Sequence, residues 1–318
     1  MKSKNKGKPL WYRALISLLV LLLLLGVLGY YSDIPVEELQ KNYADNASQF
    51  AKFENGFKVH YKDEGKGMPI VLVHGTASSL HTWDAWANEL KKEYRVIRMD
   101  IPGFGLTGPN PERDYSIKKY TQFLDEFLTK IEIDSMYLVG NSLGGNIAWN
   151  YTAEHLSKVK KLVLVDASGI PTGKEQPWIF KLAKTPILNK LFLGITPKFI
   201  IRKNLEQVYV DHHKITDELI TRYHQLALRE GNRQAFIDRA NIDFKKGDTL
   251  RLSKIKTIET KTLVLWGEKD TWIPLDNAHK FMKLLPNAEL TVLKETGHVP
   301  MEENPIVSLQ KTLVFLKK

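Results

Sequence analysis

The chain has 318 residues, no cysteine and a formal net charge of +10. The lack of cysteine excludes a disulfide-stabilised scaffold, a thiol nucleophile and a cysteine-ligated zinc site. An aromatic content of 10% and a charged content of 26% exclude a disordered or fibrous chain.

The N-terminal segment differs in composition from the rest of the chain. Residues 1–13 form a basic flank, and residues 14–31 form an uncharged, mostly apolar run. As a helix, that run would be about 27 Å long, close to the ~30 Å hydrocarbon core of a bilayer. It predicts a single-pass transmembrane signal-anchor with a cytoplasmic N-terminus, which places the remaining chain on the outer, periplasmic or extracellular, side of the membrane. The alternative is a cleaved signal peptide, which would yield a secreted protein.

Residues 32–52 are predicted to form a short helical connector, and an alternation of strands and helices begins at residue 53. The expected strands cover residues 57–62, 70–73, 94–99, 136–139, 162–165, 262–266 and 290–293. The expected helices cover residues 116–131, with Ser116 as the N-cap, 143–155 and 305–317. Buried strands that alternate with helices predict an α/β fold with a doubly wound, mostly parallel sheet.

A long insertion, residues 171–247, separates two of the expected strands. It has helical stretches and no convincing strand, so we expect a helical lid over the carboxyl end of the sheet, where such sheets bind ligands. Residues 53–170 and 248–318 would then form the core. Between residues 174 and 203 the lid carries seven basic side chains and one acidic side chain among many apolar ones, which favours contact with a membrane surface.

Residues 140–144 (GNSLG) join an expected strand to an expected helix. This is the Gly-x-Ser-x-Gly pattern in the setting that places a serine hydroxyl on a strained turn at the end of a sheet. Glycine at both outer positions avoids side-chain collisions around the turn. We therefore predict that Ser142 is a nucleophile, and that the Leu143 N–H at the start of the helix stabilises a developing oxyanion.

Further motifs accompany this turn. They are residues 73–76 (VHGT), 100–105 (DIPGFG), 267–270 (GEKD) and 297–298 (GH). On these motifs, residues 53–318 resemble the α/β-hydrolase superfamily, and within it membrane-associated monoacylglycerol lipases and bacterial lipases and esterases. The resemblance implies an α/β-hydrolase fold, with His298 as the catalytic base, Asp270 as its carboxylate and the Thr76 N–H as the second oxyanion donor. Asp166 is the alternative carboxylate, because it also ends an expected strand and some relatives take their acid there.

Two other polar residues in these motifs are predicted to have structural roles: His74 within the oxyanion loop, and Asp100 in its Pro-Gly turn. No cofactor or metal site is predicted, because the sequence has no His-Glu-x-x-His motif and its carboxylates are scattered. Residues 103–108 match a dinucleotide-binding string, but the prolines that follow prevent the helix which that motif requires. No basic stripe indicates nucleic-acid binding, and the sequence carries no signal for an oligomeric state.

The predicted function is the hydrolysis of carboxylic esters, including monoacylglycerol-like lipids, by a carboxylesterase or lipase that forms an acyl-enzyme on Ser142. One alternative is a carbon–carbon bond hydrolase of ring-cleavage dienoates. Such relatives usually have Gly-Pro-Gly after the His-Gly of the oxyanion loop and Trp after the catalytic histidine, whereas this chain has residues 76–78 (TAS) and Val299. Haloalkane dehalogenases and epoxide hydrolases, which this chain also resembles, use aspartate at the position of Ser142, so the serine argues against those activities. Another alternative is a membrane-tethered binding module without catalysis.

Overall fold

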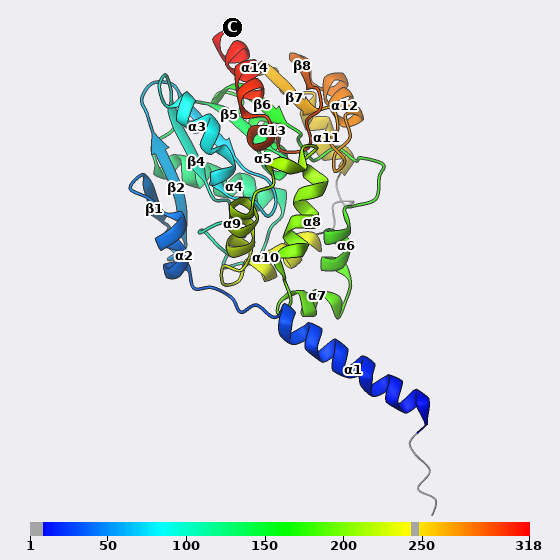
Figure 1. Cartoon of the computed structure of the whole chain (residues 1–318). Helices are drawn as coiled ribbons and strands as arrows, with labels where there is room; N and C mark the ends of the chain where they lie inside the picture. The colour runs from blue at the N-terminus through cyan, green and yellow to red at the C-terminus, as the bar shows by residue number, and fades with distance from the viewer. Residues whose placement is uncertain (1–8, 243–247) are drawn as a thin grey trace, which may run out of the picture.

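The computed structural model describes residues 9–242 and 248–318, and an eight-stranded sheet forms its centre (Figure 1). The strands are β1 (Ser48–Lys52), β2 (Lys58–Glu64), β3 (Pro69–Val73), β4 (Arg95–Met99), β5 (Met136–Asn141), β6 (Val159–Val165), β7 (Thr262–Gly267) and β8 (Ala288–Leu293). They lie in the spatial order β1-β2-β4-β3-β5-β6-β7-β8. Strand β2 runs antiparallel to β1 and β4, and every other neighbouring pair is parallel. The predicted mostly parallel sheet is therefore confirmed.

Helices cover both faces of the sheet. The side chains of β3 show this arrangement, because Val71 and Val73 lie in one apolar core while Ile70 and Leu72 lie in the other. The first core includes residues of α4 (Ile117–Lys130), α5 (Leu143–Glu154) and α12 (Asp276–Leu284). The second includes residues of α3 (Asp84–Leu90) and α14 (Pro305–Lys317). Burial on both faces explains why these strands are continuous apolar runs rather than alternating ones.

The connector predicted over residues 32–52 is only partly helical. Helix α2 (Val36–Tyr43) is followed by strand β1, which pairs with β2 at the edge of the sheet. The sequence pattern missed β1 because only Ala51 of its side chains is buried, while Gln49 and Phe50 are exposed. An edge strand with so little apolar periodicity gives no clear signal.

The N-terminal helix corrects the predicted membrane anchor and its location. Helix α1 (Leu10–Gly29) extends away from the rest of the molecule (Figure 1). It ends at Gly29 because Tyr30 and Tyr31 leave the helix and pair with residues 194–195, with Tyr31 N 2.8 Å from the Gly194 carbonyl oxygen. The uncharged part of α1 would thus be about 24 Å long, less than the ~30 Å hydrocarbon core.

In the described ranges, no helix is both long and apolar enough to span a bilayer. The predicted anchor over residues 14–31, and the outer-side location that depended on it, are therefore wrong. Residues 1–8 of the predicted basic flank lie outside the described residues.

Helices fill the insertion between β6 and β7. They are α6 (Trp178–Lys184), α7 (Leu188–Phe192), α8 (Lys198–Val208), α9 (Asp217–Ala227) and α10 (Asn232–Ala240), and α11 (Asp248–Ile255) precedes β7. We call α6–α10 the lid. Within it, α8 packs on α9 and α10 packs on α6. No sheet strand occurs in the described part of this insertion, and residues 243–247 of the predicted lid lie outside the described residues.

Candidate active site

Ser142 occupies a strained turn between β5 and α5. Its backbone has φ 53° and ψ −115°, a conformation that costs a non-glycine residue about 1–3 kcal/mol. A Cβ on Gly140 would lie 2.2 Å from the carbonyl oxygen of Gly144, so glycine is required there to close the turn. A Cβ on Gly144 would instead lie 2.1 Å from the carbonyl oxygen of Val73. The second glycine therefore permits close packing against β3 rather than relieving a collision across the turn.

The imidazole of His298 contacts the carboxylate of Asp270. His298 Nδ1 lies 2.7 Å from Asp270 Oδ2, and both side chains are buried. Asp270 Oδ1 accepts two backbone hydrogen bonds, from Trp272 N at 2.8 Å and Ile273 N at 2.9 Å. With Nδ1–H donating to Asp270, the lone pair of His298 is on Nε2. This orientation is the one a general base needs.

Ser142 and His298 line the same cavity but do not form a hydrogen bond. His298 Nε2 is buried, and no described residue is its hydrogen-bond partner. In structures without substrate, catalytic hydrogen bonds are often long and shorten when substrate binds. The Nε2 lone pair is thus available in the cavity that Ser142 reaches.

Asp166, the alternative carboxylate, lies beside this pair but has a different role. Its Oδ1 accepts the backbone N–H of Gly267 at 2.9 Å. Burial, and then the negative charge of Asp270, raise the pKa of Asp166 well above its ordinary value of 3.8. Asp166, Asp270 and His298 also offer ligand atoms within 4.8 Å of one another. A metal would have to break the contact between Asp270 and His298, so we assign this contact to the orientation of the imidazole rather than to a metal site.

The predicted oxyanion donors lie beside the serine. Thr76 lines the same cavity as Ser142, and a Cβ on the preceding Gly75 would lie 3.0 Å from Ser142 Cβ. Among the described residues, no hydrogen-bond acceptor is found for the backbone N–H of Thr76 or of Leu143. Two unoccupied N–H groups near a serine hydroxyl can bind the oxygen of a tetrahedral intermediate.

His74 holds this loop in place from inside the protein. Its Nδ1–H donates to the Gly75 carbonyl oxygen at 2.7 Å, and its Nε2 accepts the Ile101 N–H at 3.1 Å. Burial lowers the pKa of His74, so the ring stays neutral and can both donate and accept. These contacts agree with the structural role predicted for this residue.

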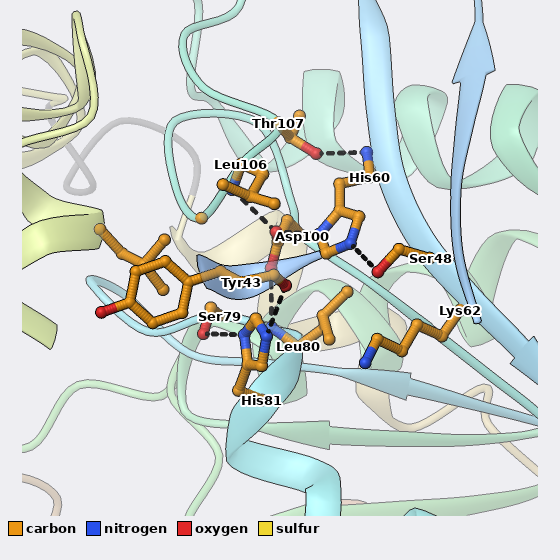
Figure 2. A network of polar contacts seen from close by, with 12 residues as sticks. Tyr43, Ser48, His60, Lys62, Ser79, Leu80, His81, Asp100, Leu106 and Thr107 are labelled. Carbon is orange, nitrogen blue, oxygen red and sulfur yellow. Dashed lines mark hydrogen bonds and ion pairs between the residues drawn. The ribbon is translucent and has the colours of Figure 1, made fainter. Parts of the chain in front are cut away.

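Asp100 is the centre of a buried polar network (Figure 2). Its Oδ1 accepts Leu80 N at 2.7 Å, and its Oδ2 accepts Leu106 N at 2.8 Å and lies 2.8 Å from His60 Nδ1. Burial alone would raise the pKa of Asp100, but the hydrogen bond from His60 and the nearby histidines outweigh it and lower the pKa to about 2. The ionised carboxylate therefore joins the loops that follow β3 and β4, as predicted for its turn.

This network contains a second series of contacts between a serine, a histidine and an aspartate. Ser48 Oγ on β1 lies 2.9 Å from His60 Nε2, and Figure 2 marks this contact with a dashed line. Ser48 Oγ also accepts the Asp45 N–H at 3.1 Å, and one carboxylate oxygen of Asp45 is 3.5 Å away. That carboxylate would repel a developing oxyanion. We therefore assign these contacts to the attachment of β1 to the sheet.

Sequence reasoning missed two residues that position the histidine loop. Asn141 Nδ2 donates to the carbonyl oxygens of Val165, at 3.2 Å, and His298, at 3.0 Å. Buried Glu303 accepts the N–H of Gly297 at 2.6 Å, and through its other oxygen those of residues 210 and 211 at 2.6 and 2.8 Å. The position of Asn141 next to Ser142 in the sequence could have indicated a role in the site. No sequence pattern indicated such a role for Glu303.

Two cavities meet at Ser142. The first has a volume of about 120 Å³ and extends under the lid. Its apolar wall includes Ile179, Phe180, Phe192, Ile200, Leu205, Val208, Leu226 and Phe236. The second has a volume of about 710 Å³ and shares Thr76, Ser142, Phe180 and Trp272 with the first. Its remaining wall is more polar and includes Asn146, Ser168, Thr172, Lys184, Arg239 and Asn241.

Known proteins share this architecture. The family described as alpha/beta hydrolase fold matches residues 68–186. The 2-hydroxy-6-oxo-2,4-heptadienoate hydrolase of Pseudomonas putida is 30% identical over 78% of this chain and 89% of its own length. The 2-hydroxy-6-oxo-6-(2'-aminophenyl)hexa-2,4-dienoic acid hydrolase of Metapseudomonas resinovorans is 27% identical over 83% of this chain and 89% of its own length. A crystal structure of a candidate lipase from Acinetobacter baumannii has a TM-score of 0.72 and 26% identity, covering 90% of this chain and 97% of that one.

Proposed function

Because the chain belongs to the α/β-hydrolase family, we propose that it is a serine hydrolase that cleaves carboxylic esters through Ser142, His298 and Asp270. The observation that carries this proposal is the shared cavity, which is lined both by the strained serine and by an imidazole that a buried carboxylate orients. Nothing in the proposal depends on a membrane.

The proposed reaction begins with attack of Ser142 Oγ on the ester carbonyl carbon. His298 Nε2 accepts the hydroxyl proton, and Asp270 stabilises the imidazolium that forms. The N–H groups of Thr76 and Leu143 bind the oxyanion. When the carbon–oxygen bond breaks, the imidazolium protonates the leaving alcohol and an acyl-enzyme remains. Water, activated by the same base, then releases the acid and restores the serine.

The two cavities suggest where the halves of the ester lie. The apolar wall of the first cavity suits an acyl chain, because burying apolar surface is favourable by about 25 cal/mol per Å². The wider and more polar second cavity gives the alcohol a way out and the hydrolytic water a way in. We therefore propose that the acyl chain lies under the lid and the alcohol lies in the second cavity.

Dienoate carbon–carbon bond cleavage is the second candidate, because the two curated relatives described above are dienoate hydrolases. A dienoate carries a carboxylate, which needs a cationic partner when buried. In the first cavity the cationic side chain is Arg233, which is paired with Asp33 at 2.6 Å. This pairing favours an uncharged ester over a dienoate in that cavity.

A panel of substrates separates the candidates. We expect turnover of p-nitrophenyl esters and monoacylglycerols, with loss of turnover in Ser142→Ala and no cleavage of a 2-hydroxy-6-oxo-dienoate. Cleavage of the dienoate with higher kcat/KM than any ester would replace the first candidate by the second. Absence of turnover with every substrate in the wild-type protein would favour a binding module.

A further inference from the structure

The cavity under the lid is lined by two residues that each have a buried polar atom without a hydrogen-bond partner among the described residues. Asn232 Oδ1 and Arg233 Nη1 are buried and lack a hydrogen-bond partner in the described part of the chain. Both residues line the cavity that Ser142 reaches, and each is only 4% exposed. A buried polar atom without a partner typically costs about 1–3 kcal/mol. Two such atoms on consecutive residues that line the cavity therefore point to a ligand that supplies the missing partners.

The orientation of the Asn232 amide is fixed by its own contacts. Its Nδ2 donates to the Gly105 carbonyl oxygen at 3.0 Å and to the Leu226 carbonyl oxygen at 2.8 Å. Reversing the amide would place an oxygen against two carbonyl oxygens. Oδ1 is thus the atom left over, and it can only accept a hydrogen bond.

The charge of Arg233 is balanced by a residue of the N-terminal segment. Arg233 Nε and Nη2 both donate to Asp33 Oδ1, at 3.1 and 2.6 Å. Nη1 is left over, and it can only donate a hydrogen bond. Because Asp33 already neutralises the guanidinium, this wall of the cavity offers one donor and one acceptor without a net positive charge.

We propose that Asn232 and Arg233 form a subsite that binds a hydroxyl group of the substrate. A hydroxyl group fits both atoms, since it donates to Asn232 Oδ1 and accepts from Arg233 Nη1. A carboxylate fits only Arg233 and would be repelled by Asn232 Oδ1 and Asp33. This inference rests on the proposed ester hydrolysis and deepens it: the substrate is an ester whose acyl chain, lying under the lid, carries a hydroxyl group.

The first test compares matched substrates. The probes are a medium-chain p-nitrophenyl ester and the same ester with a hydroxyl group on the acyl chain. We expect kcat/KM to be at least about 10-fold higher for the hydroxylated ester, because a site that hydrogen-bonds a hydroxyl group discriminates against the analogue without it. A second pair, a monoacylglycerol and the propyl ester of the same acid, tests a polyol alcohol as the source of the hydroxyl group. A preference confined to this second pair would contradict the assignment to the acyl chain.

Substitutions at the subsite test whether Arg233 causes the preference for the hydroxylated ester. In the double variant Arg233→Met with Asp33→Asn, which leaves neither charge unpaired, we expect the ratio between hydroxylated and plain ester to fall to about 1. The matched control is Arg113→Met with Asp238→Asn, a pair at 2.7 Å in which Arg113 is largely exposed. That control should keep the wild-type ratio. An unchanged ratio in the first double variant would overturn the subsite.

Binding separates a failure of this subsite from a failure of the proposed function. Calorimetry on Ser142→Ala, with each intact ester as titrant, measures affinity without turnover. We expect about 10-fold tighter binding of the hydroxylated acyl ester, even if catalysis follows another route. Equal affinities would show that the polar atoms hold water only, and would overturn the subsite while leaving ester hydrolysis standing.

Discussion

The side-chain amide of Asn141 donates a hydrogen bond to the backbone carbonyl of His298, with 3.0 Å between the two atoms. The residue before the serine thus holds the loop that carries the imidazole. From the lid, the carbonyl oxygen of Val208 accepts the His298 N–H at 2.9 Å. The backbone of the histidine is therefore fixed from two sides, by strand β5 and by the end of helix α8.

Removing the first of these contacts should affect catalysis more than binding. We expect Asn141→Ala to lower kcat on a p-nitrophenyl ester by about 10–100-fold with little change in KM, because a small displacement of a catalytic group is costly. Asn150→Ala is the matched control, since Asn150 is also buried but bonds to Asn146 within α5. Steady-state kinetics of both variants, with circular dichroism to verify folding, check this. Equal losses of kcat would contradict the positioning role.

The two aspartates near His298 should differ in their effect on turnover. Asp270→Asn replaces the carboxylate that fixes the histidine tautomer, and in serine proteases the analogous change lowers kcat about 10⁴-fold. We expect a loss of about 10³–10⁴-fold here. Asp166→Asn should keep kcat within about 3-fold of wild type, because the partner of His298 Nδ1 is Asp270, whereas Asp166 accepts the Gly267 N–H. Kinetics at pH 7 and 8 decide between the two residues, and a larger loss in Asp166→Asn would reverse the assignment.

Asp166 should also affect the pH dependence of stability. Its pKa is raised in the folded state, so above pH 3.8 the folded protein keeps a proton that the unfolded chain releases. Folding stability therefore falls as the pH rises from 3.8 towards the raised pKa. An asparagine side chain cannot ionise, so the advantage of Asp166→Asn over wild type should grow with pH above about 4. Urea unfolding at several pH values measures this difference, and a constant difference would show that Asp166 is ionised in the folded protein.

Most of the fold was predictable because short sequence patterns specify its central strands and its helices. The strands of the sheet centre are short apolar runs, and helix α4 begins where expected, with Ser116 accepting the Lys119 N–H. Strand β1 was missed because its burial comes from pairing at a sheet edge rather than from periodicity. The membrane anchor was wrong because contacts with the lid, more than 160 residues away, end the helix at Gly29.

The candidate site was predictable only in part, because some of its contacts join residues that are far apart in the sequence. Each member of the proposed triad sits in a short motif, and the structure brings Asp270 and His298 into contact. Their catalytic roles stay predictions. The pairing of Asp33 with Arg233 joins residues 200 positions apart and has no local signature. The position of Asp166 beside Asp270, and hence its raised pKa, likewise depends on which strands are neighbours in the sheet.

Asp100 should stabilise the fold except in strong acid. Its pKa is about 2, below the ordinary value of 3.8, so its contribution is complete above pH 3.8 and is lost as the pH falls through 2. At about 1.4 kcal/mol per pKa unit, we expect Asp100→Asn to reduce the free energy of unfolding at pH 7 by about 2 kcal/mol or more. Asp45→Asn, which removes a more exposed partner of Lys62, should cost less than about 1 kcal/mol. If the loss in Asp100→Asn persisted unchanged at pH 2, the carboxylate would not be the source of the stability.

Covalent labelling should distinguish the two serines that contact or face a histidine. Ser142 has a strained backbone, a cavity open to a probe and two nearby N–H donors, whereas Ser48 lies 3.5 Å from the carboxylate of Asp45. We therefore expect a fluorophosphonate probe to label wild type and Ser48→Ala equally, and to label Ser142→Ala not at all. The reason is that the two N–H donors near Ser142 can stabilise the negative charge that develops on the phosphoryl oxygen, whereas the Asp45 carboxylate near Ser48 would repel it. Mass spectrometry of the digested protein identifies the labelled peptide. A labelled Ser48 peptide from Ser142→Ala would show that the second serine, with His60 and Asp100, is a nucleophile in its own right.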